Sequence, residues 1–167
     1  MSFISKVELK YQLKQMVIAA NVVYHFLDNV KLKTALLKNS LSPQRWKHYI
    51  ESENAFFSGI SLALPLSDKL SATLDRDAVL ILDRTKINKL KTFLINSNRV
   101  YLQTKGLVDH NYDPTAYKFE SETPDELFVV DKLQPLNDYV VDIQLFKSNE
   151  MITKLVNDYK NKYKIKI

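Results

Sequence analysis

Residues 21–27, with the sequence NVVYHFL, combine β-branched and aromatic side chains in one short apolar run. Such residues are typical of β-strands, so we expect a strand here, with His25 near its centre. Asp28 follows directly and can cap a helix whose apolar side chains lie between Val30 and Leu37. The stretch therefore predicts a strand that leads at once into a capped helix.

Further elements are expected on both sides of this pair. Apolar residues at helical spacing predict a helix over residues 3–20. The helix after Asp28 should end near Asn39, because Pro43 cannot continue it. Residues 44–54 are polar and indicate a short helix or an ordered loop.

The later part of the chain contains mostly strand candidates, of which the clearest is the buried run AVLILD at residues 78–83. The other predicted strands are residues 55–64, 90–96, 100–103, 126–130 and 139–146, followed by a C-terminal helix over 150–164 capped by Ser148 or Asn149. Gly59, inside one strand pattern, indicates a bulge or a close approach to another backbone or a ligand. The strands follow one another too closely for helical crossovers, so we predict an α+β fold with a largely antiparallel sheet.

Length and composition favour one globular domain over residues 1–167, with 46% hydrophobic and 26% charged residues. There is no cysteine, which excludes disulfides and thiolate metal sites. No apolar run approaches the roughly 20 residues of a membrane span, and the N-terminus does not match a signal peptide. We therefore expect a cytoplasmic protein without membrane contact. The abundance of lysine, asparagine and isoleucine suggests an AT-rich genome, such as that of a phage.

The net charge of +5 is distributed unevenly. Residues 1–50 carry eight Lys or Arg against two acids, and the last 21 residues carry six lysines against two acids. Residues 108–146 hold nine acids against two lysines. Basic ends attract polyanions such as nucleic acid, although lysine-rich helices are also ordinary solvated surfaces.

Five segments of the chain, in their order, resemble the ADP-ribosyltransferase fold, and in particular its divergent phage and bacterial members. They are Val23-Tyr24-His25, the leucine-rich run of residues 32–41, Gly59-Ile60-Ser61, VLILDR at residues 79–84, and Asp125-Glu126 followed by an apolar strand and Gln134-Pro135-Leu136. The resemblance covers residues 21–146 and leaves residues 1–20 and 147–167 as added helices. It implies an ADP-ribosyltransferase-like split, mostly antiparallel sheet with flanking N- and C-terminal helices.

The resemblance also implies that a cleft between two small sheets binds NAD as a substrate, without a metal. His25 would hydrogen-bond the ribose and amide end of the dinucleotide, and Ser61 would lie beside the nicotinamide ribose. Glu126 would be the catalytic carboxylate at the ribose 2′-hydroxyl. Tyr24 and Gly59 belong to the same motifs and are predicted NAD contacts. Cleavage of the nicotinamide–ribose bond develops positive charge on the sugar, which a fixed carboxylate stabilises, and ADP-ribose would pass to a protein or nucleic acid.

Other interpretations stay open from the residues alone. A histidine on an apolar strand is commonly a hydrogen-bonded core residue, and Asp125 competes with Glu126 for the acidic role. His48 and His110 are expected at the surface. A metal site built from these two and His25 is conceivable, but the three show no ligand spacing.

Two departures from the family pattern favour a different class of function. Family members usually have glycine after the histidine, where this chain has Phe26, and residues 62–64 are apolar where the family has polar residues. The alternative is therefore a non-catalytic binding protein on a degenerate scaffold, for instance a phage protein that binds nucleic acid or a host defence factor. The sequence does not set the oligomeric state.

Overall fold

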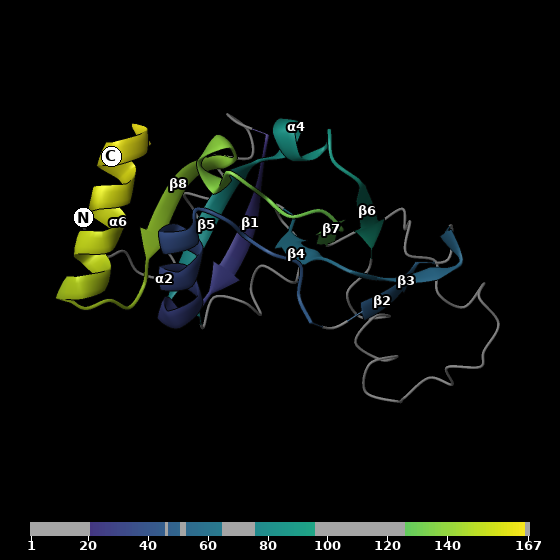
Figure 1. Cartoon of the computed structure of the whole chain (residues 1–167), viewed down its shortest axis with the longest axis horizontal. Helices are drawn as coiled ribbons and strands as arrows, with labels where there is room; N and C mark the ends of the chain where they lie inside the picture. Colours follow the sequence, from purple (N-terminus) through teal and green to yellow (C-terminus); the bar gives the residue numbers. More distant parts are fainter. Residues whose placement is uncertain (1–20, 46, 51–52, 65–75, 96–125, 166–167) are drawn as a thin grey trace.

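The computed structural model describes residues 21–45, 47–50, 53–64, 76–95 and 126–165 (Figure 1). In chain order the elements are β1 (Val22–Leu27), α2 (Asn29–Lys38), β2 (Lys47–Ile50), β3 (Ala55–Ser58), β4 (Ile60–Ala63), β5 (Ala78–Asp83), α4 (Arg84–Ile87), β6 (Thr92–Ile95), β7 (Glu126–Val129), the 3₁₀ helix η3 (Leu136–Asp138), β8 (Val140–Leu145) and α6 (Glu150–Tyr163). The helix predicted over residues 3–20 and the strand predicted over 100–103 lie outside the described residues.

Six strands form one sheet in the order β6-β7-β4-β1-β5-β8, and β2 and β3 form a separate hairpin. Every strand pair in the described sheet is antiparallel. The predicted α+β class with a largely antiparallel sheet is therefore confirmed. Figure 1 shows α2 and α6 side by side near β8 and β5, with the hairpin at the opposite end of the molecule.

Side-chain hydrogen bonds set where the two longer helices begin. The Asp28 carboxylate accepts from the Lys31 backbone N–H at 2.9 Å, and the Asn149 side chain accepts from the Ile152 N–H at 2.9 Å. These are N-caps, and they settle the choice between Ser148 and Asn149. Asn39 ends α2 in the left-handed conformation, at a φ of 48°. No helix in the described part of the chain is long and apolar enough to cross a membrane.

The sheet has two different faces. Val23 and Leu27 of β1 belong to the main hydrophobic core, which also contains the buried side chains of α2 and α6, so we call this the helix-bearing face. Tyr24 and Phe26 point to the opposite face, where they pack with residues of β4, β5 and β8. The apolar spacing in residues 150–164 predicts a buried helix face that contains Met151, but Met151 is largely exposed and Ile152 is buried instead.

The sheet consists of two parts that meet at one residue pair. The long half-sheet (β8-β5-β1) has ladders of five and six paired residues. The short half-sheet (β4-β7-β6) has two ladders of four pairs. Between them, β1 and β4 are in register only at Tyr24 and Ala63. We call this place the junction.

The expectation of a short helix or loop over residues 44–54 is wrong, because Lys47–Ile50 is a strand paired with Ala55–Ser58. The predicted strand 55–64 is divided at Gly59, so that β3 joins the hairpin and β4 enters the main sheet. His48 was expected at the surface, but it is half-buried on the hairpin. Its ring centroid lies 5.0 Å from that of Phe128.

Candidate functional site

His25 and Ser61 meet at the junction. The Nδ1 atom of His25 lies 3.1 Å from the Ser61 backbone carbonyl oxygen. His25 directly follows Tyr24, and Ser61 lies two residues before Ala63, so the bond is next to the Tyr24–Ala63 pair. A carbonyl oxygen only accepts, so Nδ1 carries the proton and, in the neutral ring, Nε2 is the acceptor. The hydrogen bond therefore fixes the tautomer and the position of the imidazole between the two half-sheets.

The side chains of His25 and Ser61 nevertheless start from opposite faces of the sheet. His25 alternates with Tyr24 and pairs with Leu80 of the main core, so it projects on the helix-bearing face. Ser61 pairs with Phe128 and projects on the other face. The structure thus brings the imidazole to the backbone of Ser61 and not to its hydroxyl.

Glu126 opens β7 and lies on the same face as Ser61. It pairs with Ala63, while Ser61 pairs with Phe128, so the two polar residues are diagonal neighbours with Cα atoms roughly 7–8 Å apart. Glu126 is 2% exposed. A carboxylate this deeply buried persists only with hydrogen-bonding or charged partners, and it is a group that a closed site can hold in one position.

Tyr24 is fully buried at the junction, and its burial raises the pKa of its hydroxyl to about 12. It flanks Ala63 from β1, as Glu126 flanks Ala63 from β7. The three residues therefore form one row across the sheet. Ala63 cannot be recognised from the sequence as part of this row, because a small apolar residue in an apolar run carries no signal of its position between two polar side chains.

Close packing explains why residue 59 is a glycine. A Cβ atom at this position would lie 2.5 Å from Cζ of Phe128 and 2.7 Å from the Val129 carbonyl oxygen. Such contacts are too short for any side chain, so only glycine lets the chain pass from β3 into β4 here. The predicted close approach is to β7 of the same chain.

Phe26 lies next to the junction and packs toward β8. Its ring stacks on Phe146, with centroids 6.4 Å apart and planes 14° apart, and it also contacts Tyr24. Phe146 follows β8, so the Phe26 ring lies over the long half-sheet. The residue that departs from the family pattern therefore lies on the same face as Ser61 and Glu126, beside the junction.

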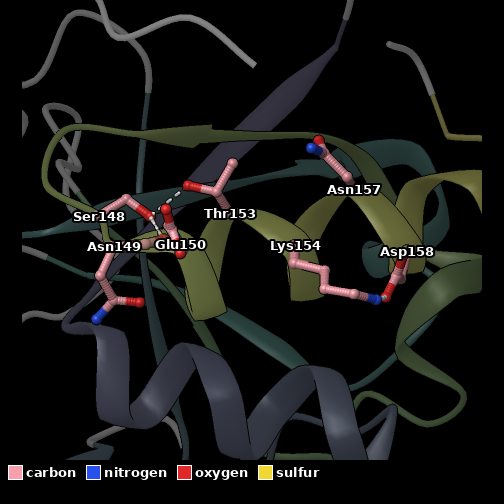
Figure 2. Close-up of a pocket in the computed structure, with 7 residues that line it drawn as sticks. All are labelled: Ser148, Asn149, Glu150, Thr153, Lys154, Asn157 and Asp158. Atoms are coloured by element: carbon pink, nitrogen blue, oxygen red, sulfur yellow. Dashed lines mark hydrogen bonds and ion pairs between the residues drawn. The ribbon is translucent and has the colours of Figure 1, made fainter.

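An open hollow of about 580 Å³ lies at the start of α6 (Figure 2). Its lining in the described residues consists of Ser148, Asn149, Glu150, Thr153, Lys154, Asn157 and Asp158. Two contacts satisfy part of this lining, a 2.8 Å hydrogen bond between Ser148 and Thr153 and a 2.7 Å ion pair between Lys154 and Asp158. None of the predicted site residues takes part in it.

Within the described ranges, no group of three or more His, Asp or Glu side chains is placed to hold a metal ion. His110 and Asp125, two of the competing candidates, lie outside those ranges. Comparison with known proteins gives no match to a family model, to a curated protein or to a solved structure.

Proposed function

We propose that the junction belongs to an NAD-binding cleft and that the protein transfers ADP-ribose from NAD to a macromolecular acceptor. In this proposal the long and short half-sheets are the two small sheets of an ADP-ribosyltransferase-like split. The observation that carries it is the single Tyr24–Ala63 pair, beside which His25 is bonded to Ser61. The pairing of β1 with β4 is limited to this residue pair, and it lies where two of the family-like motifs meet.

Each proposed role uses the position of one residue. His25, held by its Nδ1–H bond, presents Nε2 as an acceptor toward a ribose hydroxyl. Ser61 and Glu126 share the other face, where the carboxylate stabilises the positive charge that develops on the ribose. The C–N bond to nicotinamide breaks, nicotinamide leaves with the bonding electrons, and an acceptor nucleophile bonds to the sugar and releases its proton.

The acceptor is a protein or a nucleic acid. The net charge of +5 favours a polyanion, or a protein bound to one, because positive surface raises the rate and strength of association with phosphate backbones.

A second candidate is the non-catalytic binding protein. It is favoured by the opposite projection of His25 and Glu126 and by the deep burial of the Glu126 carboxylate. A sugar held by both residues would have to reach around the junction, whereas a binding protein needs no such access.

NAD titration followed by thermal unfolding separates the two candidates. A ligand that binds only the native state raises its stability, by roughly 2.7 kcal/mol at a hundred times the dissociation constant. We expect a rise in the unfolding midpoint with NAD, and no rise in a His25→Ala variant that retains its fold. An unchanged midpoint at millimolar NAD would favour the binding protein.

Turnover is tested with Glu126→Gln. We expect the release of nicotinamide to fall at least 100-fold while the midpoint shift with NAD is kept, because the carboxylate acts mainly in the transition state. Glu150→Gln, the same change at an exposed position on α6, is the control and should retain full activity. Equal activity of the two variants would remove Glu126 from the mechanism.

A further inference from the structure

The outward surface of α2 carries two large aliphatic side chains. Val30 is 76% exposed and Leu37 is 64% exposed, although the same helix buries Leu32, Ala35 and Leu36 against the sheet. Val30 and Leu37 are seven residues apart, close to two helical turns, so they lie on one stripe opposite the buried face. Exposed aliphatic side chains in one stripe of a helix mark a contact surface when their surroundings select a partner.

The surroundings of this stripe are basic on both sides. Lys33 lies on one side, and Lys31 and Lys38 lie on the other, according to the 100° step of the helix. All three are exposed, and α2 contains no acidic residue. Within the described residues the ion pairs involve other lysines, namely Lys91, Lys154 and Lys160.

We propose that this lysine-flanked stripe of α2 is a docking surface for an acidic amphipathic helix of another protein. Such a helix lays an apolar seam against Val30 and Leu37 and sets its carboxylates against the flanking lysines. The Thr34 hydroxyl, which lies in the stripe between these two residues, already donates to the Val30 carbonyl at 3.1 Å, so the centre of the surface needs no further polar partner.

Other occupants fit this surface less well. A second copy of α2 would place three lysines against three lysines, which is repulsive. Nucleic acid would use the lysines but would gain little from two aliphatic side chains. A membrane surface binds amphipathic helices through wider apolar faces, usually with aromatic residues. The surface is independent of the NAD site and would serve either candidate function.

The test uses the full chain and a fluorescent helical peptide with leucines at helical spacing flanked by glutamates. Fluorescence anisotropy should show binding that weakens as salt is raised. The double variant Val30→Ala/Leu37→Ala keeps a strong helix former at each position and should bind at least tenfold more weakly. Lys31→Glu/Lys33→Glu should lose binding to a similar extent.

Matched controls lie elsewhere on the surface. Met151→Ala removes an exposed aliphatic side chain from α6, and Lys89→Glu reverses an exposed charge after α4, and both should bind like the unmodified chain. No binding of the glutamate peptide, or equal binding of a peptide with lysine in place of glutamate, would overturn the proposal. The proposal would also be overturned if the peptide did not bind and the α2 variants instead lost binding to phosphatidylglycerol vesicles. The same holds if the variants lost self-association measured by sedimentation.

Discussion

The two half-sheets are stabilised in different ways. The long half-sheet has ladders of five and six residue pairs, is mostly aliphatic, and is covered by α2 and α6. The short half-sheet has four-residue strands, and its outer face packs aromatic rings, including Phe93 and Phe128, against the β2–β3 hairpin. The comparison indicates that the long half-sheet depends on backbone pairing and helix packing, and that the short half-sheet depends on how individual side chains fit.

The two residues of the junction belong to different half-sheets. Tyr24 lies in β1, which pairs with β5 along its whole length. Ala63 lies in β4, which begins after Gly59, where the chain packs closely against the Phe128 ring. Substitutions in the two half-sheets should therefore differ in mechanism as well as in size.

The largest expected effect is in the long half-sheet, at the buried ion pair between β8 and α6. The Asp142 carboxylate accepts from Lys160 Nζ at 2.7 Å and from Gln144 Nε2 at 2.6 Å. Asp142→Ala leaves the lysine charge buried without its partner and should destabilise the protein by about 3–5 kcal/mol in urea unfolding. The double variant Asp142→Leu/Lys160→Met, which removes both charges, should recover most of that loss. A double variant as unstable as the single one would show that the charges themselves stabilise the fold.

In the short half-sheet, Gly59→Ala should destabilise by about 2–3 kcal/mol, because the new methyl overlaps the Phe128 ring and the Val129 carbonyl. Chemical denaturation measures this loss. Combining it with Phe128→Leu, which removes the overlapping ring atoms, should give less than the sum of the two single effects. Additive losses would mean that the ring is not the obstacle.

At the junction the expected effect depends on pH. Burial raises the pKa of Tyr24 from 10.0 to about 12, so the native state holds this proton more tightly than the unfolded chain does. The resulting stability is fully present below pH 10 and is lost as pH rises toward 12, by about 1 kcal/mol near pH 11. Unfolding free energies of the unmodified chain and of Tyr24→Phe, measured from pH 9 to 11, should converge by that amount. Parallel curves would contradict it.

The smallest change in unfolding free energy is expected at the N-cap of α6, the helix that packs on the long half-sheet. Asn149→Ala removes the acceptor for the Ile152 N–H and should cost about 1 kcal/mol in unfolding free energy. Ser148→Ala, at the neighbouring position that does not cap the helix, should cost less. The reverse order would show that the cap had been assigned to the wrong residue.

The elements that sequence predicted best are those with signals at both ends. Asp28 and Asn39 delimit α2, and β5 is an apolar run long enough to be buried on both faces. The buried face of α6 was harder to predict. Met151 and Ile152 are both apolar, and either one fits the helical spacing of the buried residues that follow.

Two errors arose where local patterns compete with tertiary contacts. Residues 47–50 are half polar, and they form a strand because β3 and the aromatic cluster offer them partners. Residues 55–64 are mostly apolar and were predicted to form one strand. The chain instead divides into β3 and β4 at Gly59, and the close packing of Gly59 against Phe128 explains the position of the break. The short helix α4 was missed because four residues carry too little periodicity, although Asp83 caps it.

The candidate site was predictable only as a set of residue types. Motif order predicted that His25, Ser61 and Glu126 lie together. The structure places them on the neighbouring strands β1, β4 and β7, with His25 on the opposite face of the sheet from the other two. Which face each side chain takes depends on strand register, and a shift of one residue would reverse it. Register between strands distant in sequence is not encoded in any one of the motifs.

The position of Lys160 has a consequence for how this protein behaves at high concentration. β8 is the outermost strand on its side of the described sheet, and outermost strands tend to recruit strands from other molecules. A charge pair turned inward beside that strand, with α6 lying alongside it (Figure 1), opposes such edge-to-edge aggregation. The buried pair of Asp142 and Lys160 therefore has a role at the edge of the sheet that is separate from its effect on folding stability.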